Sequence, residues 1–150
     1  MINQIFARFF LNKIAQLYIP LSIKSIFEPE IARGDYREGA QIEIILRPST
    51  IIHNSIYSYN LRRHLGAISQ GYEDINVPFL IVAGHQDYIV SSKNQSQRLH
   101  NEIPKSEYLL FKGVGHMPHH TQTNILADKI WRMSKGEALT PGKMEFFDEK

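Results

Sequence analysis

Hydrophobic residues at the start of the chain recur at the spacing of one helical face. From Ile2 onward they lie at positions 2, 5, 6, 9, 10, 14, 17, 18 and 21, which predicts an amphipathic helix. Pro20 is expected near the end of this helix. A second short apolar piece should stop before Pro29, because the residue before a proline avoids the helical region.

A further helix is expected after the brief apolar patch that ends at Pro48. Ser49 or Thr50 is the predicted capping residue, since a hydroxyl there can accept a hydrogen bond from the first turn. Residues 1–70 are therefore predicted to be mainly helical.

The character of the sequence changes after residue 70. The unbroken apolar run 79–83 predicts a strand buried on both faces, as in a parallel sheet. Ser92 with Gln95 three positions later has the spacing of a helix capping box. A second strand is expected over 107–111 and a second helix over 121–133. Strand, helix, strand and helix in this order predict a parallel unit of the α/β class.

The chain is thus expected to divide into a helical region at 1–70, an α/β core at 71–135 and a tail at 136–150. The tail is rich in charged residues and contains glycine and proline. Such a composition favours a segment that is only loosely held.

Composition narrows the functional classes. The chain has 150 residues with 43% hydrophobic residues, 21% charged residues and a net charge of +2, which is typical of a soluble globular domain. It contains no cysteine, which excludes disulfides and thiolate metal sites, and no apolar run long enough for a membrane span. Acidic and basic residues nearly cancel, so nucleic acid is not an expected partner. Without a recognisable targeting segment, the default expectation is a cytoplasmic protein.

Two residues carry the candidate chemistry. Asp87 follows the first predicted strand and His116 follows the second, and both turns should lie on the same carboxyl edge of a parallel sheet. A carboxylate that accepts the imidazole N–H fixes the tautomer and leaves the other nitrogen to deprotonate a nucleophile. Gly113 and Gly115 suit a loop that bends sharply to aim the imidazole. The alternative is an ordinary surface aspartate and a loop histidine.

These residues carry a resemblance to a known family. The stretches 77–90 and 113–119 resemble the C-terminal core of an α/β-hydrolase, in which a G-x-x-D-x-x-V turn presents the triad acid and a G-x-G-H loop presents the triad histidine. The resemblance assigns these catalytic roles to Asp87 and His116. Leu46-Arg47-Pro48 and the segment 72–75 resemble, less specifically, the helical cap of serine hydrolases in this family and its return to the core.

The family's nucleophile has no counterpart in these residues. Its G-x-S-x-G elbow precedes the acid and the histidine, and no such motif occurs here. The nearest sequence, around Ser69, has its serine one place too late and follows no predicted strand. The family's oxyanion loop is also missing. The resemblance therefore implies a truncated or split hydrolase that contributes the acid and base for hydrolysis of an ester or related acyl bond, and that is inactive alone.

Two other interpretations remain open. The chain could be a non-catalytic remnant of the fold that binds a small ligand or a protein. It could also be half of a dehalogenase or epoxide hydrolase, in which an aspartate replaces the nucleophilic serine.

Metals and cofactors are not expected. His116, His119 and His120 lie close together, but no carboxylate is spaced with them as a metal ligand would be. The expected partners are an ester-like small molecule, if an N-terminal half completes the site, and a second polypeptide or another copy of the chain at an unpaired strand edge. Two parallel strands are too few to bury their own faces and edges, so marginal stability is expected.

Overall fold

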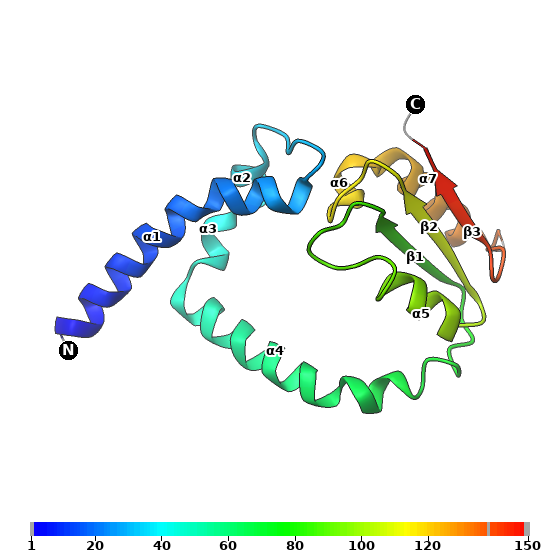
Figure 1. The fold of residues 1–150 in the computed structure, drawn as a ribbon, viewed down its shortest axis with the longest axis horizontal. Helices are drawn as coiled ribbons and strands as arrows, with labels where there is room; N and C mark the ends of the chain where they lie inside the picture. Colours follow the sequence, from blue (N-terminus) through cyan, green and yellow to red (C-terminus); the bar gives the residue numbers. More distant parts are fainter. Residues whose placement is uncertain (1, 138, 149–150) are drawn as a thin grey trace. The chain divides into compact units, whose positions relative to one another are not determined.

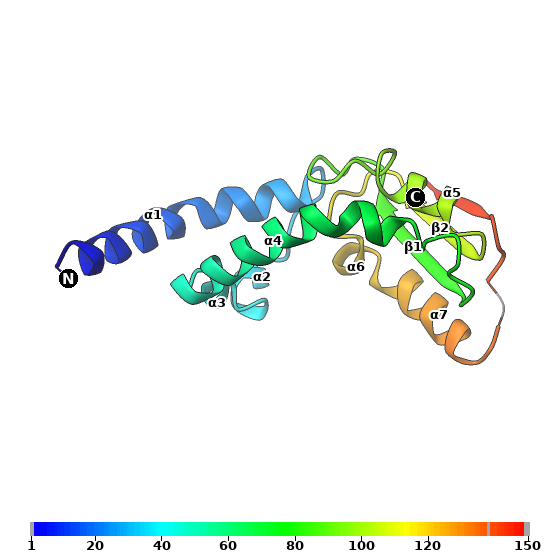
Figure 2. The same cartoon turned by 90° about the horizontal axis from the view of Figure 1, so that it is seen from below.

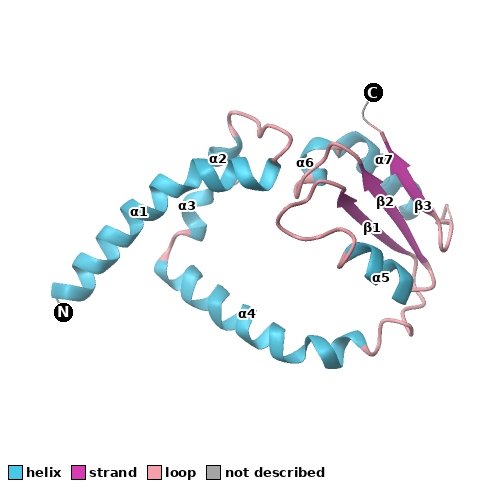
Figure 3. Ribbon diagram, in the orientation of Figure 1, coloured by secondary structure: helices cyan, strands magenta, loops and turns pink. Residues whose placement is uncertain are grey.

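The computed structural model of the protein describes residues 2–137 and 139–148 (Figure 1). Its described residues fall into two compact units. The helical unit takes in those of Met1–Lys24 and Ala32–Ala67, and the α/β unit takes in those of Ser25–Ile31 and Ile68–Lys150. Helices combined with a small parallel sheet confirm the predicted α/β class (Figure 3).

The first seventy residues are mainly helical, as predicted. They form α1 (Ile2–Phe27), α2 (Tyr36–Gly39), α3 (Ile42–Ile45) and α4 (Pro48–Ser69). Among the described residues, every helix is too short or too polar to cross a lipid bilayer.

Two helix boundaries differ from the prediction. Helix α1 continues through Pro20 as far as Phe27, although a proline inside a helix removes one backbone hydrogen bond and crowds the turn before it. Its end does fall just ahead of the Glu28–Pro29 pair, as predicted. Helix α4 begins at Pro48 itself, so Ser49 lies inside the first turn instead of capping it. Proline is well suited to a first helical position, where its missing N–H would have no partner.

The α/β unit contains a three-stranded parallel sheet. Its strands are β1 (Phe79–Gly84), β2 (Ser106–Phe111) and β3 (Met144–Phe147), in the spatial order β1-β2-β3 (Figure 1). The first two strands and their parallel pairing confirm the prediction. The expectation of a loosely held tail is wrong, because residues 144–147 of that tail pair with β2. The ring of Phe147 stacks on that of Phe111 with 4.8 Å between centroids, which helps to hold the strand in the sheet.

Helices cover the two faces of β2 from opposite sides (Figure 2). On one face, Leu99 of α5 (Ser96–Glu102) packs on the cluster of Ile81, Tyr108 and Leu110. On the other, Leu126 of α7 (Thr123–Ser134) packs on Leu109, Phe111 and Val114. Every residue of β2 is buried, as expected for a central parallel strand.

The helices of this unit differ from the prediction in where they begin. Helix α5 starts at Ser96 and not at Ser92, and its N-cap residue Gln95 makes no side-chain capping bond. Instead, Ser91 Oγ accepts a hydrogen bond from the Asn94 N–H at 3.2 Å, which stabilises a turn ahead of the helix. The predicted helix at 121–133 corresponds to α7, which starts two residues later, and the single turn α6 (Pro118–Thr121) precedes it.

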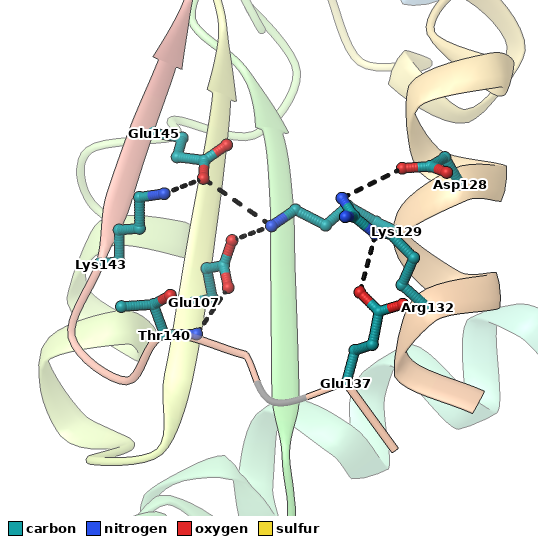
Figure 4. Close-up of polar contacts among 8 residues, drawn as sticks. All are labelled: Glu107, Asp128, Lys129, Arg132, Glu137, Thr140, Lys143 and Glu145. Carbon is teal, nitrogen blue, oxygen red and sulfur yellow. Dashed lines mark hydrogen bonds and ion pairs between the residues drawn. The ribbon is translucent and has the colours of Figure 1, made fainter. Parts of the chain in front are cut away.

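A buried ion pair joins β2, β3 and α7 (Figure 4). The Glu107 side chain on β2 is 1% exposed and accepts hydrogen bonds from Lys129 Nζ of α7 and, at 2.9 Å, from the Thr140 N–H. Lys129 Nζ also lies 3.8 Å from Glu145 of β3, which pairs with Lys143. These contacts attach the turn ahead of β3, and β3 itself, to the core.

The charge of Glu107 is stabilised despite its burial. Burial alone would raise the pKa of this carboxyl group. The hydrogen bonds from Lys129 and Thr140, together with the positive charges of Lys129 and Lys143, outweigh burial and hold the pKa below its usual value of 4.5. A lowered pKa in the folded state stabilises the fold at neutral pH, and this contribution is lost as the pH falls below about 4.5.

We expect Lys129→Met to lower the free energy of unfolding by about 3 kcal/mol, because it leaves the Glu107 carboxylate buried without its partner. The loss should be largest at neutral pH and shrink at acidic pH, where Glu107 is protonated. Urea denaturation at several pH values measures both effects. Lys112→Met is the control, because the Lys112–Asp148 ion pair is exposed and should contribute at most about 1 kcal/mol. Equal losses in the two variants would contradict the assignment.

Candidate functional site

The two candidate residues follow neighbouring strands. Asp87 lies in the turn after β1 and His116 in the loop after β2. The parallel register sets Gly84, the last residue of β1, beside Phe111, the last residue of β2, so both connections leave the same edge of the sheet (Figure 3). A hydrogen bond of 2.8 Å from the His85 N–H to the Phe111 carbonyl continues this pairing into the turn.

Asp87 and His116 form a hydrogen-bonded pair. His116 Nδ1 lies 2.8 Å from Asp87 Oδ2. The other carboxylate oxygen of Asp87 accepts hydrogen bonds from the N–H groups of Ile89 at 2.9 Å and Val90 at 2.8 Å, which fix the carboxylate against the backbone. The Asp87 side chain is 9% exposed and that of His116 is 37% exposed. The structure thus brings together the two residues that spacing singled out, and their catalytic role stays a prediction.

This geometry selects one tautomer of His116. A carboxylate oxygen only accepts hydrogen bonds, so Nδ1 must carry the proton and Nε2 is the basic nitrogen of the neutral ring. The carboxylate would also stabilise the imidazolium that forms when Nε2 takes up a proton. The pair therefore has the chemistry of an oriented general base.

Gln86 joins the turn that carries Asp87 to the loop that carries His116. Its side-chain oxygen accepts a hydrogen bond from the Gly113 N–H at 2.7 Å, and its backbone N–H donates to the Val114 carbonyl at 3.1 Å. Gly113 has a φ of +76°, a left-handed conformation that glycine adopts without strain. No sequence pattern identifies Gln86, because a glutamine beside an acid has no recognisable signature.

The segment at the end of α1 holds the opposite side of the histidine loop. The His116 N–H donates to the Ile26 carbonyl at 3.1 Å, and the Gly115 N–H donates to Glu30 Oε2 at 3.3 Å. A Cβ atom on Gly115 would lie 2.3 Å from the Glu28 carbonyl oxygen, so only glycine fits at this position. Both glycines of the loop are thus explained, one by its conformation and the other by a close backbone contact.

Two further histidines follow His116 in the short helix α6. His119 and His120, both within α6, have ring centroids 4.5 Å apart. Burial lowers the pKa of His119, and the nearby His120 and His116 act in the same direction, so a neutral ring is favoured at pH 7. Within residues 2–137 and 139–148, no three histidine or acidic side chains are grouped as a metal site requires.

Ser69, the nearest sequence match to the family's nucleophile, does not follow a strand. It is the last residue of α4, and the element that leads to it is a helix, whereas a nucleophile elbow connects a strand to a helix.

Known proteins offer no direct guide to the role of this pair. Comparison of the chain with models of protein families found no match, and comparison with curated protein sequences found none.

We expect Gly115→Ala to destabilise the α/β unit by about 2 kcal/mol, because the added methyl group would collide with backbone atoms that cannot easily move. The midpoint of urea denaturation measures this loss. Gly66→Ala is the matched control, since nothing lies within 4 Å of a Cβ atom at this α4 position and alanine favours helices. Wild-type stability in Gly115→Ala would contradict the close contact.

The hydrogen bond between Asp87 and His116 has a spectroscopic signature. A proton on Nδ1 that is held by a carboxylate should appear as a low-field imidazole resonance in NMR spectra of the full chain. Asp87→Asn should abolish or shift this resonance, because the amide cannot replace the charge of the carboxylate. Asp74→Asn, in the turn before β1, should leave it in place. An unchanged signal in Asp87→Asn would mean that the two side chains are not paired in solution.

Proposed function

We propose that this chain is part of an α/β-hydrolase and contributes the acid and base of a Ser-His-Asp triad for ester or related acyl-bond hydrolysis. The observation that carries the proposal is the 2.8 Å hydrogen bond between His116 Nδ1 and Asp87 Oδ2. It joins the acid and the histidine of two motifs that resemble those of the family, and it lies at the sheet edge where α/β proteins form their sites.

In the proposed reaction, His116 Nε2 accepts the proton of a serine hydroxyl while the serine oxygen attacks the acyl carbon. The imidazolium then donates this proton to the leaving alcohol as the tetrahedral intermediate collapses to an acyl-enzyme. Asp87 stays ionised, orients the ring through Nδ1 and stabilises its positive charge. A water molecule, deprotonated in the same way, releases the acid. These 150 residues hold no G-x-S-x-G motif, so the proposal assigns the serine to another polypeptide segment.

The outer edge of β1 is the proposed attachment point of that segment. The N–H groups of Phe79 and His85 donate toward β2, so the alternating backbone groups of Leu80 and Val82 face away from it. No strand pairs with that edge in the described part of the chain. Strand β1 is wholly apolar and lacks the charges or proline that usually protect an exposed edge. A further parallel strand would satisfy these groups and extend the sheet.

Ester hydrolysis tests the proposal. The chain alone should hydrolyse 4-nitrophenyl acetate at a rate close to that of free imidazole, because His116 has no nucleophile to activate. Mixing it with a polypeptide that supplies the elbow should raise the rate by at least about a hundredfold, and both His116→Ala and Asp87→Asn should abolish the gain. The DNA upstream of the Met1 codon, translated in all three frames, is the first place to seek that polypeptide.

Two outcomes would count against the proposal. Clear hydrolysis by the chain alone that His116→Ala leaves unchanged would remove the pair from the reaction. An upstream region with no strand, elbow and helix in frame, and no separately encoded half that restores activity, would favour a non-catalytic binding role.

A further inference from the structure

The loop that carries His116 is held through its backbone from two sides. On the side of β1, two hydrogen bonds from Gln86 hold the first half of the loop. On the other side, the N–H groups of Gly115 and His116 donate to the segment 25–31, which belongs to the α/β unit. The backbone groups next to the imidazole are therefore held by a part of the chain that lies outside the strands and turns of the sheet.

The segment 25–31 is anchored by an aromatic side chain. Phe27 is 2% exposed, and the centroid of its ring lies 5.9 Å from that of the His120 ring. The Ile26 carbonyl, in the last turn of α1, accepts the His116 N–H at 3.1 Å, which satisfies a group that has no partner within the helix. Burial of a side chain as large as Phe27 is a strong attachment, so loss of the Glu30 carboxylate should leave the segment in place.

The Glu30 carboxylate acts on the peptide group that precedes His116. Its Oε2 accepts the Gly115 N–H at 3.3 Å, across 85 positions of sequence. Glycine has the widest choice of backbone conformations, so a loop glycine beside the histidine needs outside contacts if the ring is to keep one orientation. The bond between His116 Nδ1 and Asp87 Oδ2 requires the two atoms to stay within about 3 Å of each other, which a shifted backbone would prevent.

We propose that Glu30 is a positioning residue for His116: its carboxylate fixes the Gly115 peptide group so that the imidazole keeps Nδ1 on Asp87. This inference rests on the proposed function, because orientation of the ring matters for hydrolysis only if His116 is the base. Glu30 need not touch the substrate or exchange a proton. Since it acts on a backbone N–H, an uncharged oxygen acceptor at the same place should replace it.

NMR of the full chain tests this role in Glu30→Ala. The Gly115 N–H should exchange with solvent about five- to tenfold faster than in the wild type, because it has lost its acceptor. The low-field resonance of the His116 Nδ1 proton should broaden or disappear, because the ring is no longer held against Asp87. Glu30→Gln keeps a side-chain oxygen at this position and should restore both signals.

Glu28→Ala is the matched control, because it removes an exposed carboxylate from the same segment. Glu28 contacts the histidine loop through its backbone carbonyl, which the substitution retains. Both NMR signals should therefore stay as in the wild type. Equal effects in Glu28→Ala and Glu30→Ala would point to the charge of the segment and would overturn the proposal.

A second measurement separates positioning from simple attachment of the segment. The midpoint of urea denaturation and the ring resonances of Phe27 should be nearly the same in Glu30→Ala and in the wild type. A lower midpoint together with shifted Phe27 resonances would make Glu30 an anchor of the segment, against the proposal.

Failure of this inference differs from failure of the proposed function. A low-field resonance that is present in the wild type and unchanged in Glu30→Ala would overturn the role of Glu30 alone. A resonance missing from the wild type would overturn the pairing of Asp87 with His116, and with it both proposals.

Discussion

The parallel register between β1 and β2 is the constraint on which the candidate site depends. Because Gly84 is paired with Phe111, the chain leaves both strands at the same level, and the next residues of the two connections are close enough to bond to each other. A shift of this register by one residue would turn each side chain of the shifted strand to the opposite face of the sheet and would separate Asp87 from His116. The geometry of two side chains is thus decided by main-chain pairing several residues away.

The third strand connects the buried ion pair on one face of the sheet with a cavity on the other face, which Asp87 of the candidate pair also lines. It is attached to the core by the buried charge of Glu107, which holds both Lys129 of α7 and the turn at Thr140. Its own side chains Met144 and Phe146 then form part of the wall of the cavity on the α5 face. The ion pair on one face of the sheet therefore maintains the cavity on the other face.

Sequence patterns predicted the parts of this protein that depend on local order. The apolar run 79–83 and the strand at 107–111 were recognisable because both faces of these strands are buried, and the spacing of Asp87 and His116 from them was sufficient to place the pair at one edge. Strand β3 was missed because its four residues are flanked by charges and follow a turn that contains Pro141 and Gly142. Gln86, Glu30 and Glu107 were missed because their roles arise from contacts with residues distant in the sequence, which no local pattern records.

The two edge strands of the sheet differ in their charged side chains. This difference limits how many further strands could be added. Glu145 of β3 and the flanking residues Lys143 and Asp148 are each engaged in an ion pair, whereas β1 has no charged side chain. A fibre of paired strands needs two unprotected sheet edges on every molecule, because each subunit must pair with one neighbour at each edge. With a single unprotected edge, the outer edge of β1, association would end after one partner has been added. The product would be a finite complex with a defined stoichiometry.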